Sequence, residues 1–208
     1  LPTFQALKQL GFSSSMTDRF WKPFMRGVFL ENGLSTSVRK FEETFRLFAQ
    51  GQTALPRLGI GEIPQQMARS LPPNCLRLSH RVGKVGNHFV ESADGQRWEG
   101  REVVLATESD VADQLLGIES EKPKSWNSVD CLYFSLPSGD LPIAKPILHL
   151  DGSGIGPVNN LTFLSTLSTC APQGRALASA SVIGQSHRDL HSLTEEARRQ
   201  LTHWFGKK

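Results

Sequence analysis

The sequence predicts an α+β fold in which a mixed, largely antiparallel sheet is accompanied by helices. Three observations lead to this fold class. Apolar residues recur at helical spacing through residues 1–55. Residues 56–112 change to short alternating runs separated by turn residues. Residues 113–208 contain four strand-like runs and then one amphipathic helix. The same three zones are the predicted domain organisation of the chain.

The first zone begins and ends with a predicted helix. Phe4, Leu7 and Leu10 have helical spacing, and Gly11 is a suitable residue to end that helix. A later helix is predicted from Ser37 to Gln50, ending at Gly51. One side of that helix is an apolar, mainly aromatic stripe: Val38, Phe41, Phe45 and Phe48.

The segment between these helices, residues 15–30, is crowded with large apolar side chains. Pro23 and Gly27 are expected to break or kink a helix here. The aromatic side chains of this segment and of the 37–50 stripe have two interpretations: a wall for a flat apolar substrate, or ordinary core packing. Core packing is favoured for any single residue, because aromatic side chains dominate protein cores.

The second zone starts with a glycine turn, residues 59–61, that leads into a helix. Pro64 suits an early helical position, and the helix has an apolar side and a Pro72-Pro73 stop. That apolar side consists of Ile63, Met67 and Leu71.

Short strands are predicted after this helix. They fall at residues 76–78, 81–85, 89–90 and around Trp98, with a hairpin turn at Asp94-Gly95. Glu102–Thr107 is expected to be a buried strand. Its small terminal residues would allow a ligand or another backbone to approach closely.

The third zone is predicted to be a sheet closed by a helix. The strand candidates are residues 129–136, 147–150, 161–167 and 176–183. The last helix is expected to begin at Ser192, because Glu195 three residues later completes a capping box. Its predicted buried face consists of Leu193, Ala197, Leu201 and Trp204.

Composition excludes several classes of protein. The net charge of +3 is small for 208 residues, and the basic residues are scattered among acidic ones, so no nucleic-acid partner is expected. The sequence has no run of about 18 apolar residues, so no membrane-spanning helix is expected. Three widely spaced cysteines predict buried, reduced thiols in an intracellular protein. The opening Leu1-Pro2 suggests a piece of a longer protein.

Familiar catalytic and nucleotide-binding motifs are missing from the sequence. The run from Gly152 to Pro157 is not G-x-G-x-x-G and precedes a strand-like run, so a surface loop is predicted. His187 and His191 have no carboxylate partner at ligand spacing, and no metal site is expected. No G-x-S-x-G motif occurs. Lys84 and Lys145 are weak candidates for acid–base chemistry, since most lysines are solvated surface groups.

Several stretches, taken in order, resemble the flavin-containing amine oxidase superfamily. They are residues 20–30 (FWKPFMRGVFL), 34–37 (LSTS), 55–64 (LPRLGIGEIP), 81–82 (RV), 103–107 (VVLAT), 156–160 (GPVNN) and 171–174 (APQG). Within that superfamily they look most like the branch of phytoene desaturases and protoporphyrinogen oxidases. The resemblance covers nearly the whole chain, and its specificity lies in the order and spacing of the motifs.

The resemblance implies a two-lobed FAD protein in which the chain crosses between the lobes. Residues 1–55 and 113–208 would belong to the substrate lobe, and residues 56–112 would return to the FAD lobe. The cofactor contacts implied by matching positions are Val82 near the adenine, Ala106 and Thr107 near the dinucleotide, and Gly59 and Gly61 near the flavin.

For the substrate lobe, the resemblance implies helices that roof an apolar tunnel. Phe20, Phe24 and Phe29 are the expected substrate-lining residues. The implied reaction is hydride transfer from a large hydrophobic substrate to FAD. No catalytic acid or base can be named.

Two elements of the family pattern are absent from this sequence. They are the G-x-G-x-x-G unit that holds the pyrophosphate and the closing Gly-Asp segment that meets the flavin. We therefore expect the chain alone to be inactive and to bind FAD weakly or not at all.

Two alternatives to a flavoenzyme piece stay open. One is a non-enzymatic module that binds an apolar ligand. The other is a module that contacts a membrane surface or a partner through Phe24, Met25 and Phe29. Self-association is a further expectation, because exposed apolar groups favour it.

Overall fold

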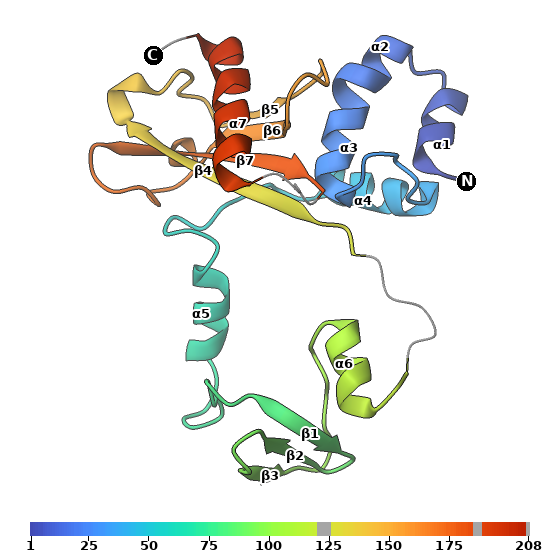
Figure 1. The fold of residues 1–208 in the computed structure, drawn as a ribbon, viewed down its shortest axis with the longest axis vertical. Helices are drawn as coiled ribbons and strands as arrows, with labels where there is room; N and C mark the ends of the chain where they lie inside the picture. Colours follow the sequence, from blue (N-terminus) through green and yellow to red (C-terminus); the bar gives the residue numbers. More distant parts are fainter. Residues whose placement is uncertain (120–125, 185–188, 207–208) are drawn as a thin grey trace. The chain divides into compact units, whose positions relative to one another are not determined.

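A computed structural model describes residues 1–119, 126–184 and 189–206 (Figure 1). The chain divides into two compact units. The larger unit consists of Leu1–Ile63 and Asn127–Lys208, and the smaller one of Pro64–Trp126. Both described sheets are antiparallel and helices accompany them, which confirms the predicted α+β class.

The larger unit is built on a four-stranded antiparallel sheet of order β4-β7-β6-β5. Its strands are β4 (Val129–Pro137), β5 (Leu148–Leu150), β6 (Val158–Phe163) and β7 (Arg175–Ile183). Helix α7 (Leu190–Phe205) lies across one face of this sheet (Figure 1). Buried residues from the helix and that face form one core: Leu132, Val158, Leu161, Phe163, Ala178, Ala180, Val182, Leu193 and Ala197.

Three of the four predicted strands in this sheet are confirmed, and the remaining one is shifted. The predicted strand 161–167 instead begins at Val158 and ends at Phe163, where a 3₁₀ turn (Leu164–Thr166) begins. Ser165 and Thr166 explain the early end. The Ser165 hydroxyl accepts a hydrogen bond from the Leu177 amide at 2.9 Å, and Thr166 Oγ1 donates to the Phe163 carbonyl at 2.7 Å. Such bonds compete with a strand ladder.

Helix α7 begins earlier than the predicted Ser192. Its N-cap is Asp189, whose carboxylate accepts the Ser192 backbone N–H at 3.0 Å and the Ser192 hydroxyl at 2.6 Å. Ser192 therefore donates to a cap and is not itself the cap. An ionised carboxylate is a stronger acceptor for these donors than a hydroxyl.

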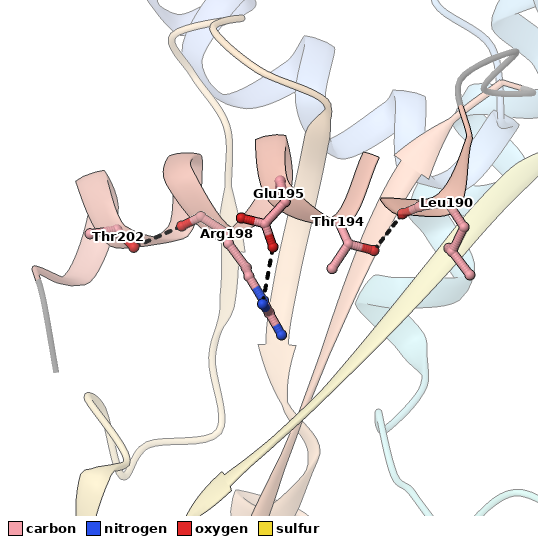
Figure 2. Close-up of polar contacts among 5 residues, drawn as sticks. All are labelled: Leu190, Thr194, Glu195, Arg198 and Thr202. Atoms are coloured by element: carbon pink, nitrogen blue, oxygen red, sulfur yellow. Dashed lines mark hydrogen bonds and ion pairs between the residues drawn. The ribbon is translucent and has the colours of Figure 1, made fainter. Parts of the chain in front are cut away.

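Polar side chains on the outer side of α7 form hydrogen bonds and an ion pair within the helix (Figure 2). Thr194 and Thr202 donate their hydroxyls to the carbonyls of Leu190 and Arg198, at 2.7 and 2.8 Å. Arg198 also pairs with Glu195 at 3.0 Å, one helical turn away. The predicted apolar face is confirmed on the opposite side, where Leu193 and Ala197 are buried and Leu201 and Trp204 pack against the same core.

The Asp189 cap predicts a pH-dependent stability. Hydrogen bonds from the Ser192 side chain and then from its backbone hold the pKa of Asp189 below its usual value. A carboxyl group with a lowered folded-state pKa stabilises the fold above its unfolded pKa and loses that effect as the pH falls through its folded pKa. We expect Asp189→Ala to lower the melting temperature at neutral pH, with the difference from the natural chain vanishing in acid. Thermal unfolding followed by circular dichroism measures this. In Asp189→Asn, which keeps an acceptor without a charge, the pH dependence contributed by this group should be lost.

A helical layer completes the larger unit. It comprises α1 (Thr3–Gln9), α2 (Ser14–Met16), a π-helical turn (Thr17–Trp21), α3 (Lys22–Phe29) and α4 (Val38–Gln50). Gly11 has a φ of +78°, as expected for the residue that follows a helix, and Ser37 caps α4 by accepting from the Lys40 amide. These two predicted helices are confirmed. The buried core of this layer is Leu7, Trp21, Met25, Leu34 and Phe41.

The helix is not broken at Pro23 or Gly27; its irregularity is the π-helical turn that ends just before α3. Pro23 lies in the first turn of α3, directly after the π-helical turn, where a missing N–H is tolerated. Gly27 has a different role. A Cβ at this position would lie 3.1 Å from Asn160 Oδ1, so glycine allows α3 to approach β6 closely.

The described part of the smaller unit contains a three-stranded antiparallel sheet, one whole helix and most of another. Its strands are β1 (Val82–Gly86), β2 (Phe89–Ser92) and β3 (Arg97–Glu99), and α6 (Ser109–Leu116) contacts β1. The predicted hairpin turn at Asp94-Gly95 is confirmed, with a φ of +87° at Gly95. Helix α5 (Glu62–Arg69) bridges the boundary between the two units in sequence.

Two predicted strands in this zone are wrong. Residues 102–107 form no strand, and Val104 is 84% exposed. Residues 76–78 form no strand either, and Leu78 is 71% exposed. A strand needs a hydrogen-bonded neighbour, and none of the described residues pairs with either segment. The apolar side of α5 is likewise exposed, with Met67 at 66%.

The prediction of buried cysteines is also wrong in part. The three thiols are free, as expected, but Cys75 and Cys131 are exposed and Cys170 is half-buried. Cys75 lies in the irregular segment after α5. Cys131 lies on the face of the large sheet that α7 does not cover, because its neighbour Leu132 is the one that points into the core.

Candidate functional site

The aromatic cavity is a space of about 610 Å³ inside the larger unit. One wall comes from the π-helical turn, α3 and α4, and contains four phenylalanines: Phe20, Phe24, Phe45 and Phe48. The opposite wall comes from the sheet face that α7 leaves uncovered: Val129, Cys131, Leu148, Leu150, Asn160 and Ser181. The remaining lining residues are Pro23, Gly27, Val28, Leu30 and Thr53.

The aromatic wall is held in shape by ring contacts. Phe20 and Phe24 lie one helical turn apart and are stacked, with centroids 5.5 Å apart and planes 7° from parallel. Phe24 also packs on Phe48 of α4 at 5.8 Å. Behind this wall, Trp21 contacts Phe20 at 5.0 Å and Phe45 at 5.2 Å. Trp21 is only 6% exposed, so it is a buried support for the wall.

The sheet wall carries a short polar band across three strands. Cys131 of β4 pairs in register with Ser181 of β7, and Ser181 pairs with Asn160 of β6. Apolar side chains of β4 and β5, such as Val129 and Leu148, flank the band. The cavity is therefore apolar on most sides and can hydrogen-bond at one place, a pattern typical of sites for small organic molecules.

The predicted substrate-lining residues divide into two groups. Phe20 and Phe24 line the aromatic cavity. Phe29 is not among its lining residues; it packs on the core around Trp21 and Met25, and its carbonyl accepts a hydrogen bond from Asn127 Nδ2 at 3.0 Å. Phe45 and Phe48 also line the cavity; the sequence offered their stripe as either a substrate wall or core packing, without naming them as substrate-lining residues. Their i, i+3 spacing next to Phe41 was the signal that could have identified them.

The predicted cofactor-binding residues lie in both units. Gly59 and Gly61 form the turn before α5, where Gly59 has a φ of +99° and accepts from the Glu62 amide at 3.2 Å. Val82 is the first residue of β1, and the exposed Ala106 and Thr107 precede α6. Their contact with a cofactor stays a prediction.

A second cavity of about 920 Å³ lies on the other side of the larger unit, between the loop of residues 151–157 and the C-terminal half of α7. This loop is not a phosphate loop, because strand β6 follows it. Its glycines serve packing: a Cβ on Gly152 would lie 3.0 Å from Arg19 Cα, and one on Gly156 would lie 2.5 Å from Gln200 Oε1. Burial lowers the pKa of His149, which lies at this cavity against the rings of Phe163 and Phe205.

The remaining candidates from the sequence do not gather into a site. His191 is exposed in the first turn of α7, and His187 lies outside the described residues. Lys84 and Lys145 are both exposed. Across residues 1–119, 126–184 and 189–206, no group of three or more His, Cys, Asp or Glu side chains is placed to hold a metal ion. Within those same ranges, no helix has the length and apolar character needed to cross a membrane.

Two of the solved structures that match this chain are similar to it over nearly its whole length. The first is reduced UDP-galactopyranose mutase, at 13% identity with a TM-score of 0.59, covering 98% of this chain and 52% of that one. The second is a protein from Pyrococcus furiosus, at 14% identity with a TM-score of 0.70, covering 99% of this chain and 55% of that one. The chain thus spans about half the length of these two structures. At this identity the similarity concerns the fold.

Comparison with curated proteins finds no match. Comparison with family models gives one match that covers residues 1–204 and is described as flavin-containing amine oxidoreductase. The aromatic cavity lies entirely within the matched residues. The chain belongs to the flavin-containing amine oxidoreductase family.

Proposed function

We propose that this chain is the central, substrate-domain portion of an FAD-dependent oxidoreductase that holds a hydrophobic substrate in the aromatic cavity. Family membership supports the flavoprotein assignment. The observation that carries the substrate assignment is the wall of four phenylalanines facing a mostly apolar sheet surface. A large hydrophobic molecule, in preference to a small amine, is the proposed type of substrate.

The residues assigned to the cofactor fit an uncharged part of FAD better than its pyrophosphate. The turn at Gly59 and Gly61 leaves backbone accessible, since a Cβ on Gly59 would meet nothing within 4 Å. Glu62 occupies the first turn of α5, and its negative charge disfavours a phosphate at that helix end. Bound FAD would supply the acceptor for a hydride.

The chain's own contribution is to bind and orient the substrate and to exclude water. Stacked rings such as Phe20 and Phe24 present a flat apolar surface on which a planar molecule can lie. The support of Trp21 keeps these rings in place when the cavity is empty, so little ordering is needed on binding. None of the described residues that line the cavity is charged, which favours a neutral substrate.

The aromatic wall is tested by Phe24→Ala. We expect this variant to weaken binding of 2-isopropenylnaphthalene, a flat apolar probe, by about 10-fold, because the ring contacts both the ligand space and two neighbouring rings. Equilibrium dialysis against the whole chain measures it. Phe4→Ala is the matched control, since Phe4 lies in α1 outside the cavity lining and is 38% exposed. Equal loss in both variants would contradict the assignment.

Cofactor binding gives an independent prediction. The 208-residue chain should bind FAD weakly or not at all, because its sequence contains no G-x-G-x-x-G unit to hold the pyrophosphate. Titration with FAD up to millimolar concentration, followed by flavin fluorescence, measures this. Tight stoichiometric binding would show that residues of this chain alone form a complete cofactor site.

The redox step is tested in a flavin-loaded protein that contains this chain. Anaerobic addition of a substrate that occupies the cavity should bleach the visible flavin absorbance. Binding without bleaching would favour the alternative of a non-enzymatic module for an apolar ligand, which the aromatic cavity also supports.

Contact with a membrane or a partner is a weaker alternative. It relied on Phe24, Met25 and Phe29, but Met25 is fully buried and the two phenylalanines are half-buried. Self-association of the chain is better supported, by the exposed apolar side chains around α5 such as Ile60 and Met67. Sedimentation velocity over a range of concentrations tests it.

A further inference from the structure

In the polar band of the aromatic cavity, hydrogen bonds fix which side-chain atoms donate and which accept. The cause is a bulge in β6. The register of β6 against β7 shifts between Val158 and Asn160, so Asn159 is an extra residue on its strand. A bulge of this kind lets two successive side chains turn toward the same element. Here both asparagines approach α3: Asn159 Nδ2 donates to the Pro23 carbonyl at 2.9 Å, and Asn160 Oδ1 lies 3.1 Å from the position of a Cβ on Gly27.

The Pro23 carbonyl determines which way each amide points. A carbonyl oxygen can only accept, so the buried Asn159 must direct its Nδ2 toward it. The same Nδ2 gives its other hydrogen to Asn160 Oδ1 at 3.0 Å. Asn160 therefore has its oxygen toward Asn159 and its Nδ2 toward the Ser181 hydroxyl, 3.4 Å away. Asn159 thus donates to α3 on one side and to Asn160 on the other, and from Asn159 through Asn160 to Ser181 each donor points toward the cavity.

This direction leaves donors at the end of the chain. Asn160 Nδ2 carries two hydrogens, and the bond to Ser181 uses one of them. The Ser181 oxygen accepts that bond, so its own hydrogen stays available. Both residues line the aromatic cavity, and within the described part of the chain neither of these hydrogens has a recorded acceptor. A ligand atom that meets them must be a hydrogen-bond acceptor.

The uncharged lining that the structure describes also limits which kind of acceptor group can bind in the cavity. Among the described residues that line it, none is ionisable to a cation, so none of them could neutralise a carboxylate or phosphate placed there. A neutral carbonyl oxygen avoids that penalty and still receives both donors. Building on the proposed function, we infer that the cavity recognises a flat apolar substrate that bears a neutral carbonyl oxygen, and that Asn160 and Ser181 bind this oxygen.

Two probes of the same shape test this inference. 2-Acetylnaphthalene carries a carbonyl oxygen where 2-isopropenylnaphthalene carries a CH₂ group, and equilibrium dialysis gives the dissociation constant of each for the whole chain. The ratio of the two constants measures the preference for oxygen. We expect Asn160→Leu to reduce this preference about 3- to 10-fold relative to the natural chain, the effect of one or two neutral hydrogen bonds. Ser181→Ala should reduce it less. Thr162→Val is the control, because Thr162 lies on the same strand outside the cavity lining and should leave the preference unchanged.

An infrared measurement on the natural chain keeps the test valid if Asn160→Leu fails to fold. The carbonyl stretch of bound 2-acetylnaphthalene should move to lower wavenumber than in an apolar solvent, and this shift should shrink in Ser181→Ala. If both probes bind but the preference and the infrared band are the same in all variants, the assignment of Asn160 and Ser181 is overturned while the cavity stands as a binding site. If neither probe binds the natural chain, the cavity assignment itself is overturned, and this inference with it.

Discussion

Replacing Trp21 with alanine is expected to lower the free energy of unfolding by about 3–5 kcal/mol, the range for removing a large buried aromatic side chain. Trp21 is 6% exposed, and its ring contacts those of Phe12, Phe20, Phe41 and Phe45 at centroid distances of 5.0 to 5.5 Å. These contacts join the π-helical turn to α4. Alanine would leave a cavity behind the aromatic wall, so binding of apolar probes should fall together with stability.

Trp21→Phe separates the packing of the ring from its polar group. The indole Nε1 of Trp21 is buried, and no hydrogen-bond partner for it exists among the described residues. An unpaired buried donor is unfavourable, and phenylalanine removes it while keeping most of the ring contacts. Urea unfolding should therefore show a much smaller loss for Trp21→Phe than for Trp21→Ala. Equal losses would mean that the indole nitrogen contributes to stability and that the aromatic contacts do not dominate.

The parts of this fold that the sequence predicted are those in which local patterns decide the structure. The α4 stripe followed from a 3.6-residue repeat bounded by Ser37 and Gly51, and both boundaries are confirmed. The hairpin followed from Asp94-Gly95. In the candidate site, the family resemblance implied Phe20, Phe24 and Phe29 as substrate-lining residues; Phe20 and Phe24 line a cavity, and Phe29 does not.

The parts that could not be predicted depend on residues distant in sequence. Residues 102–107 have the composition of a buried strand, but the described residues offer them no pairing partner, so local propensity alone gave the wrong structure. Gly27 was interpreted as a helix breaker because nothing local reveals the approach of Asn160 from a strand more than a hundred residues later. The bulge at Asn159 leaves no sequence signal either, since its cause is the register between β6 and β7.

Gln200 shows the same dependence on distant residues, and it supplies the second large prediction. It lies on the buried side of α7, 7% exposed, where the helical pattern predicts an apolar residue. Its amide binds both backbone groups of Val158: Oε1 accepts the Val158 N–H at 2.7 Å, and Nε2 donates to the Val158 carbonyl at 2.9 Å. This pair of bonds fixes α7 to β6 at the residue just before the bulge.

Gln200→Met should therefore destabilise the chain although it makes the helix face more apolar. Methionine has a similar length but removes the hydrogen bonds that Gln200 makes to the Val158 N–H and C=O, and a buried group left unpaired costs about 1–3 kcal/mol. We expect a total loss of about 2–4 kcal/mol in urea unfolding. Arg199→Met is the control: it introduces the same residue, methionine, at the adjacent exposed position and should change stability little. If Gln200→Met were as stable as the natural chain, the Val158 backbone would have to find other partners in β7, and the bulge that orients Asn159 and Asn160 would not depend on α7.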